Sequence, residues 1–134
     1  MAEAIVRTIL EHFPETLAVY LFGSFATGDE RADSDVDIAL LLPHKSSVTT
    51  VQLAMSDGRY ELEQLVGRQV DLLNLRMVST VFQKEIIMTG RVLFCCDRFV
   101  LDEFEMLTLS FYQKLNEERA GILAEIERTG VIIA

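Results

Sequence analysis

The stretch 17–42 constrains the fold more than any other part of the chain. It reads LAVYLFGSFATGDERADSDVDIALLL: an apolar run, a Gly-Ser pair, a polar connection and a second apolar run entered through two aspartates. Short runs rich in aromatic and β-branched residues are typical of buried strands. We therefore expect strands over 17–22 and 34–42, with polar side chains gathered between them.

Hydrophobic spacing predicts the remaining elements. Further strands are expected at 69–75 and 91–95, and helices at 3–12, from 46 or 47 to about 66, from 79 to 90, and from Asp97 or Asp102 to about 128. Gly58 is a candidate break in the second of these helices. Half of the residues are hydrophobic, which is enough to fill one core. The pattern predicts one α/β (α+β) domain over 1–134, with a small mixed sheet of about four strands flanked by helices and a long C-terminal helix.

Three aspartates carry the predicted chemistry. Side chains alternate along a strand, so Asp35 and Asp37 point the same way, and Asp71 joins them if its strand lies alongside. Carboxylates this close raise each other's pKa unless a cation lies between them. A hard divalent cation such as Mg²⁺ takes oxygen ligands, and three acids suit a two-metal phosphoryl transfer. Taken alone, an Asp-x-Asp is more often a solvated strand entrance, so both interpretations stand at this point.

The Gly23-Ser24 pair adds a place for phosphates. Gly23 can adopt a positive φ and let the backbone approach a ligand. The Ser24 hydroxyl and the N–H groups of a following helix start can hold phosphate oxygens. An isolated Gly-Ser pair after a strand is only a turn. Combined with the three acids, it indicates a site for a metal and a nucleotide triphosphate.

Gly23-Ser24, ten residues and then Asp35-x-Asp37 resembles the signature of the DNA polymerase β-like nucleotidyltransferase superfamily. Asp71, in QVDLLNL, lies where the third acid of that superfamily is expected. The small size, together with TGRVLF and LTLSFYQKLNEERAGIL, is similar to the minimal nucleotidyltransferase (MNT) family, the MntA-type antitoxins of HEPN/MNT toxin–antitoxin systems. The resemblance implies Mg²⁺-dependent transfer of AMP from ATP to a tyrosine of a HEPN toxin, an RNase, which silences the toxin.

The resemblance also implies a role for each residue of the motif. Gly23 and Ser24 would hold the triphosphate. Asp35, Asp37 and Asp71 would ligate Mg²⁺, in all two ions, and Asp71 would also be the base for the attacking hydroxyl.

The motif departs from its relatives at one position. Many of them carry an arginine where Thr27 stands in this chain. Arg31 and Arg76 are the candidates for supplying the cationic phosphate contact instead.

The acceptor is expected on a partner protein. Larger relatives have a second helical domain that receives the acceptor, and this chain has almost no length for one. We hypothesise that the C-terminal helix, with Phe111, Tyr112 and Leu115, is part of the docking surface. The alternative is that its apolar stripe packs on the chain's own sheet.

Composition limits the other function classes. The net charge of −9 argues against a protein that coats nucleic acid, so no direct nucleic-acid partner is expected. The longest clean apolar run, 38–42, is too short for a membrane span. Cys95 and Cys96 are sequence neighbours, which seldom form a disulfide, and a cytoplasmic location is expected. The alternatives to toxin adenylylation are a small-molecule nucleotidyltransferase and a non-catalytic antitoxin that acts by binding alone.

Overall fold

The structure, a computed structural model, describes residues 1–23 and 35–130. Within these ranges the strands form one four-stranded sheet in the order β3-β2-β1-β4. The strands are β1 (Ala18–Phe22), β2 (Val36–Leu41), β3 (Val70–Asn74) and β4 (Arg91–Cys95). Strand β1 is antiparallel to both β2 and β4, whereas β2 and β3 are parallel. The predicted mixed sheet of about four strands is confirmed.

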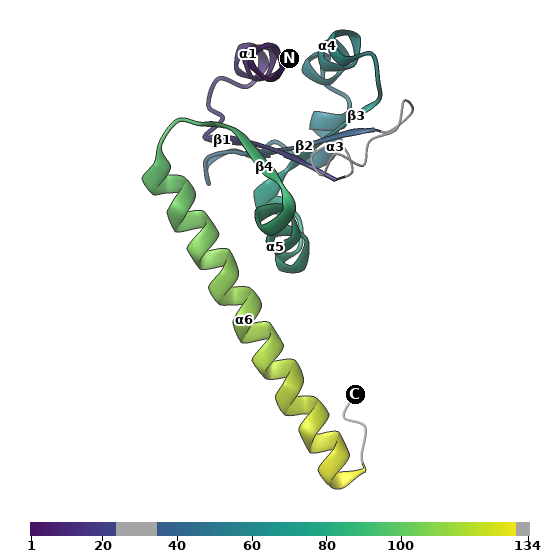
Figure 1. Cartoon of the computed structure of the whole chain (residues 1–134), viewed down its shortest axis with the longest axis vertical. Coiled ribbons are helices and arrows are strands. Elements are labelled where there is room, and N and C mark those ends of the chain that lie inside the picture. The colour runs from purple at the N-terminus through teal and green to yellow at the C-terminus, as the bar shows by residue number, and fades with distance from the viewer. Residues whose placement is uncertain (24–34, 131–134) are drawn as a thin grey trace.

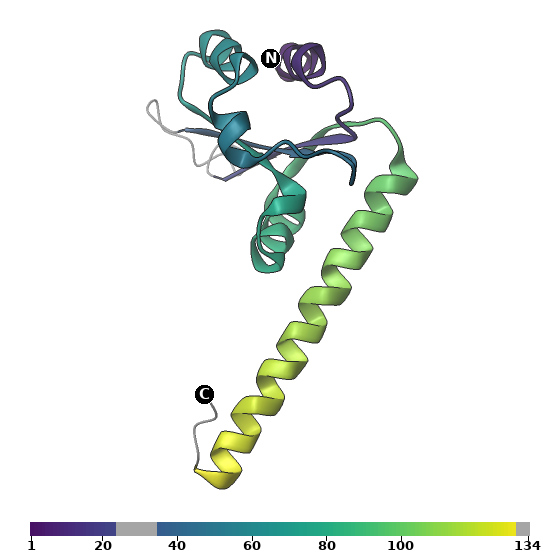
Figure 2. The ribbon, with the colours of Figure 1, turned by 180° about the vertical axis from the view of Figure 1, so that it is seen from behind.

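Helices cover both faces of this sheet (Figure 1). The helices are α1 (Ala2–His12), α3 (Thr50–Ala54), α4 (Asp57–Val66), α5 (Thr80–Thr89) and α6 (Arg98–Thr129), and a 3₁₀ turn, η1 (Leu75–Met77), follows β3. Helices α1 and α4 lie over one face, and α5 and the start of α6 lie over the other (Figures 1 and 2). No helix in the described part of the chain is long and apolar enough to cross a membrane.

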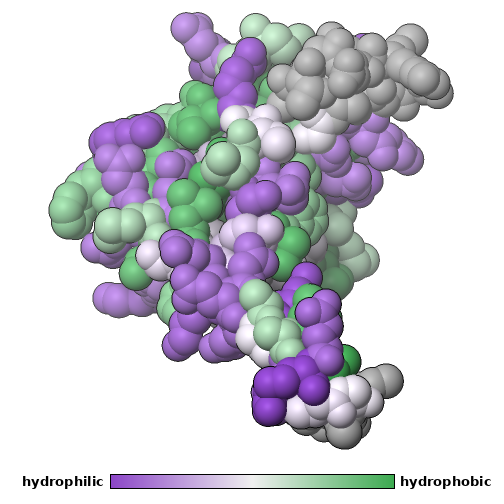
Figure 3. All heavy atoms as spheres, turned by 60° about the horizontal axis from the view of Figure 1, so that its bottom comes forward, coloured by the Kyte–Doolittle hydropathy of each residue, from purple (hydrophilic) through white to green (hydrophobic). Residues whose placement is uncertain are grey.

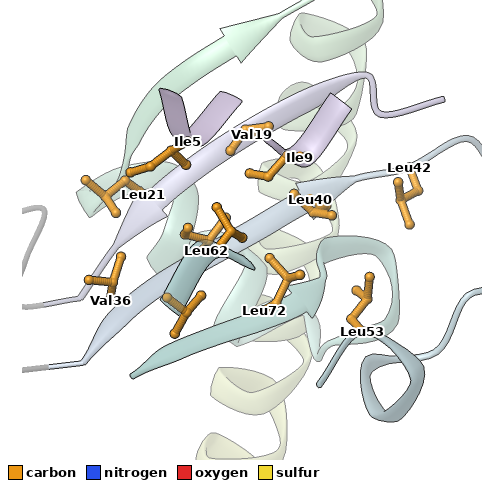
Figure 4. Close-up of a cluster of buried hydrophobic side chains, with 12 residues drawn as sticks. Ile5, Ile9, Val19, Leu21, Val36, Leu40, Leu42, Leu53, Leu62 and Leu72 are labelled. Atoms are coloured by element: carbon orange, nitrogen blue, oxygen red, sulfur yellow. The ribbon is translucent and has the colours of Figure 1, made fainter. Parts of the chain in front are cut away.

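The alternation of side chains along the strands fills both layers. On the α1 and α4 face, the strand residues pack with Ile5, Ile9 and Leu62 (Figure 4). On the opposite face, Tyr20 and Leu41 pack with Ile86 and Phe104. Because both faces are covered, β1 and β2 are almost continuously buried, which explains their unbroken apolar runs.

The single helix predicted from 46 or 47 to about 66 is wrong, because the segment forms two helices. Thr49 and Gln52 form a capping box at the start of α3, in which each side chain accepts a hydrogen bond from the other residue's backbone N–H. The Ser56 side chain then caps α4 by accepting from the N–H of Arg59. The break therefore lies at Ser56. Gly58 is instead inside α4 and fits tightly against His12 and Phe13.

Helix α6 is only partly packed on the domain. Asp97 caps it, as one of the two predicted starts, and the Tyr20 hydroxyl in β1 donates a hydrogen bond to Glu105. Leu101, Phe104 and Thr108 are its buried residues. Beyond them α6 runs away from the sheet (Figures 1 and 2). The alternative that the apolar stripe packs on the chain's own domain therefore holds for Phe104 and is wrong for Phe111 and Leu115, which are exposed.

Candidate active site

The register of the sheet places two aspartates and an aromatic ring in one row. Phe22 in β1 is paired with Asp37 in β2, and Asp37 is paired with Asp71 in β3. Residues directly opposite each other on neighbouring strands point to the same face. The row lies where β1 ends and where β2 and β3 begin, so the strand directions alone bring the polar ends of three strands together.

Asp37 and Asp71 form a coupled pair. The pKa of Asp37 is raised to about 6, first by burial, then by the charge of Asp71, by a side-chain hydrogen bond with Asp71, and finally by the charge of Asp35. A pair of carboxylates in one partly buried place favours either a shared proton or a bound cation. Their oxygen atoms are the donors that a hard divalent cation prefers, so the pair fits such an ion.

Asp35 lies apart from this pair. It precedes the first residue of β2 and is exposed. Among the described residues, no group of three acidic, histidine or cysteine side chains is close enough to form a metal site. The structure thus brings together two of the three predicted acids, while Asp35 contributes through its charge.

Gly23 is required by its contact with Asp37. Its φ is +76°, in the left-handed region that favours glycine. A Cβ atom at this position would overlap Oδ2 of Asp37. The absence of a side chain therefore lets the end of β1 lie directly against the carboxylate. Ser24, Thr27 and Arg31 lie outside the described residues.

A groove of about 560 Å³ runs beside the two aspartates. Its walls include Phe22 and Phe82, whose rings are in edge-to-face contact with 5.7 Å between centroids. On the side of α3 and α4 it is lined by Thr50 and Arg59, among other residues. The groove offers an acceptor group a place next to Asp71.

Apart from Asp37 and Asp71, sequence reasoning missed the residues that line this groove. Phe22 and Phe82 looked like ordinary core positions. The sheet register places Phe22 beside Asp37, and the packing of α5 on β1 brings Phe82 against Phe22. Arg59 is held by hydrogen bonds from its guanidinium to the carbonyl oxygens of Val70 and Ala54, at 2.9 Å each. No local motif marks these positions.

Arg76 cannot supply the cationic contact proposed for it. Its guanidinium donates to the carbonyl oxygen of Leu42 and lies 3.1 Å from His44 Nε2. Leu42 and His44 follow the end of β2, whereas Asp37 lies near its beginning. Arg76 therefore lies at the opposite end of β2 from Asp37.

Comparison with known proteins identifies the family. A family profile described as "Polymerase beta, Nucleotidyltransferase" matches residues 5–99. The chain is 31% identical over 123 residues to protein adenylyltransferase MntA of Shewanella oneidensis, a match that spans 91% of this chain and 84% of the relative.

Solved structures agree over nearly the whole chain. A toxin–antitoxin structure with AMP-PNP has a TM-score of 0.75 at 28% identity, covering 94% of this chain and 98% of the other. A tri-AMPylated Shewanella oneidensis HEPN toxin in complex with MNT antitoxin gives a TM-score of 0.72 at 25% identity, covering 94% of this chain and 95% of the other. Together with the acids at the strand ends, these matches show that the chain belongs to the polymerase beta nucleotidyltransferase family.

Proposed function

We propose that this chain is an antitoxin that transfers AMP from ATP to a tyrosine hydroxyl of a HEPN-family RNase toxin and thereby neutralises it. The observation that carries the proposal is the Asp37–Asp71 pair, which lies against Gly23 at one edge of the groove. It is supported by the relatives, one of which is named a protein adenylyltransferase and another of which is in complex with a tri-AMPylated HEPN toxin.

The reaction needs an acceptor oxygen, a proton acceptor and space for the triphosphate. Gly23, which has no side chain, leaves room for the phosphates at the end of β1, and the Ser24 hydroxyl would hold their oxygen atoms. The acceptor hydroxyl lies in the groove and loses its proton to the Asp71 carboxylate. Its oxygen then forms a bond to the α-phosphorus of ATP, while the bond from that phosphorus to the bridging oxygen breaks and pyrophosphate leaves. Phe22 and Phe82 form an aromatic wall beside this place, which suits an aromatic acceptor side chain.

The family implies ATP and a divalent metal, and we propose Mg²⁺, with two ions in the full site. Asp37 and Asp71 would hold the metal, and Asp35 would complete the set of ligands once nucleotide is bound. When bound, the metal would neutralise charge on the transferring and leaving phosphates.

We also propose that residues 1–134 act as one minimal nucleotidyltransferase domain, with the acceptor supplied by the toxin, and that the protein works in the cytoplasm, where ATP is abundant. The described cysteines, Cys95 and Cys96, are both free thiols, as suits a reducing compartment. No direct contact with nucleic acid is required.

The test is transfer of label from α-phosphate-labelled ATP, with Mg²⁺, to the protein encoded beside this one. We expect label on the partner, and a loss of about a thousandfold in rate for Asp71→Asn and for the pair Asp35→Asn and Asp37→Asn. Asp102→Asn is the control, because this exposed residue on α6 only pairs with Arg98.

Two results would contradict the proposal. A stable complex without label under any metal or nucleotide would indicate an antitoxin that acts by binding alone. Label on small hydroxylated molecules but not on the partner would indicate a small-molecule nucleotidyltransferase.

A further inference from the structure

Most of α6 presents large apolar side chains to solvent. From residue 109 onward no described residue of this helix is buried. Phe111 is 59% exposed, Leu115 45% and Ile122 52%. Figure 3 shows hydrophobic residues exposed between hydrophilic ones on the surface that includes the far end of α6. Apolar side chains gathered on one projecting helix mark a surface for interaction.

These residues continue the face by which α6 packs on its own domain. The buried residues Leu101, Phe104 and Thr108 are spaced by three and then four. The same alternation leads on to Phe111, Leu115, Glu118, Ile122 and Glu125. We call these five residues the α6 seam. Spacing by three and four residues is the pattern by which one helix packs along another.

Tyr112 does not belong to the seam. Its ring lies 5.0 Å from Lys84 Nζ in α5, and its side chain is half-buried. The contact between α5 and α6 therefore uses Tyr112, and it leaves the seam uncovered within the described chain.

The catalytic domain does not need the seam. The family profile ends at Phe99, the second residue of α6, so α6 is an addition to the part that nucleotidyltransferases share. The toxin–antitoxin structures nevertheless match 94% of this chain, which includes most of α6. The helix thus accompanies the catalytic domain in proteins that are found with a toxin.

The charges in the seam select the kind of occupant. Glu118 lies between the apolar residues Leu115 and Ile122, whereas Glu125 forms an ion pair with Arg128 of its own helix. In a pair of identical α6 helices Glu118 would face another seam glutamate or an apolar residue, which leaves a buried carboxylate without a cation. The net charge of −9 also disfavours a second copy.

We propose that the α6 seam docks a helix of the partner toxin that carries an apolar row with lysine or arginine opposite Glu118. The inference rests on the proposed function for the identity of the partner. A protein that cleaves RNA needs cationic residues to meet phosphates, so an acidic antitoxin suits it. Docking through α6 holds the toxin on the side of the sheet where Asp37 and Asp71 point, because both the acids and α6 lie on the α5 face.

The test compares two double variants of the full chain in binding to the protein encoded beside it, measured by calorimetry. Leu115→Glu with Ile122→Glu changes the seam, and we expect Kd to rise about a hundredfold or more. The matched control is Met106→Glu with Leu123→Glu, which changes side chains of similar exposure, 62% and 55%, off the seam of the same helix. We expect this control to bind like the unmodified chain. Circular dichroism checks that both variants remain helical.

Charge is tested separately. Glu118→Lys is expected to weaken binding about tenfold, and Glu117→Lys, one residue away and off the seam, to leave it unchanged. Equal effects of the two lysine substitutions would contradict the predicted cationic partner and indicate general electrostatic attraction.

Several outcomes separate this inference from the proposed function. If the Leu115→Glu, Ile122→Glu variant binds normally, the seam is not the docking surface, whatever the activity. If the unmodified chain forms the complex but transfers no label, the proposed activity fails while docking stands. With both correct, the seam variant raises KM for the toxin and leaves kcat at saturating toxin nearly unchanged. A dimer of the free chain that the seam variant abolishes would assign the seam to a second copy instead.

Discussion

In β2 the side chains of Ile38 and Leu40 have no exposure to solvent, whereas Leu115 and Ile122 in α6 are about half exposed. The same types of residue thus serve two purposes. The packing of β2 is completed by the chain's own helices, which holds Asp37 and Asp71 in register before any ligand arrives. The packing of α6 is left incomplete in the described chain, and its far half is the part that we propose docks the toxin.

Alanine substitutions in β2 and in the exposed half of α6 should differ most in their effect on the free energy of unfolding. In the free chain, Leu40→Ala should lower the free energy of unfolding by about 2–5 kcal/mol, because it leaves a cavity between β2 and the helices. Leu115→Ala should lower it by less than about 0.5 kcal/mol. Urea unfolding followed by circular dichroism measures both. A cost for Leu115→Ala as large as that for Leu40→Ala would mean that the seam is already covered in the free chain.

Two glycine substitutions test how tightly Gly23 packs against Asp37. Gly23→Ala should lower the free energy of unfolding by about 1–3 kcal/mol, because alanine is strained at positive φ and its Cβ would overlap the Asp37 carboxylate. Gly67 has a similar φ of +69° and open space at the Cβ position. Gly67→Ala therefore carries the backbone cost alone. Equal stability losses for the two variants would show that the contact between Gly23 and Asp37 costs nothing to disturb.

The acidic pair predicts a dependence of stability on pH that the α6 seam does not share. The pKa of Asp37 is raised from 3.8 to about 6, so the folded chain binds this proton more tightly than the unfolded chain. In metal-free protein, the stability due to this group is complete below about pH 4 and is lost as the pH rises through about 6. Asp37→Asn should thus raise the melting temperature at pH 7.5 and give no gain at pH 4.

Thermal melts with a chelator measure this effect, and Mg²⁺ should then stabilise the unmodified chain more than Asp37→Asn. Asp57→Asn, at an exposed acid in the first turn of α4, is the control. If Asp37→Asn leaves the melting temperature at pH 7.5 unchanged, Asp37 and Asp71 do not repel each other in the metal-free protein.

The sequence was most informative where local pattern and tertiary packing agree. Unbroken apolar runs predicted the strands within one or two residues. The Gly-Ser pair and the aspartates led us to expect one site, and in the structure Gly23 lies against Asp37. The prediction of one continuous helix from 46 or 47 to about 66 was wrong because it followed the spacing of apolar residues and overlooked the N-cap at Ser56. A serine followed by an aspartate is a recognised signal for the start of a helix.

Other features could not be predicted because they depend on distant contacts. Phe82 reaches the groove through the packing of α5 on β1. Arg76 is held at the far end of β2 by its hydrogen bond to the carbonyl oxygen of Leu42. An apolar stripe on a helix has the same spacing whether it packs on its own sheet or on another protein. The sequence therefore could not show that Thr108 is the last buried residue of α6 in the described chain.

The smallest expected effect concerns Gly121, which interrupts the exposed half of α6. Glycine inside a helix costs about 1 kcal/mol relative to alanine, and a Cβ at Gly121 would meet nothing within 4 Å. Gly121→Ala should slow hydrogen exchange of amides around it in the free chain. The melting temperature should hardly change, because the projecting half of a helix can open without unfolding the sheet.

Ala120→Gly at the neighbouring position is the matched reverse change and should speed exchange over the same residues. Slower exchange for Gly121→Ala together with unchanged toxin binding would mean that Gly121 does not contact the docked helix. If Gly121→Ala instead weakened binding while it strengthened α6, the partner helix would need the missing side chain for close approach. A drop in the stability of the free chain would show that this part of α6 is packed in solution, and the contrast between β2 and α6 would then not hold.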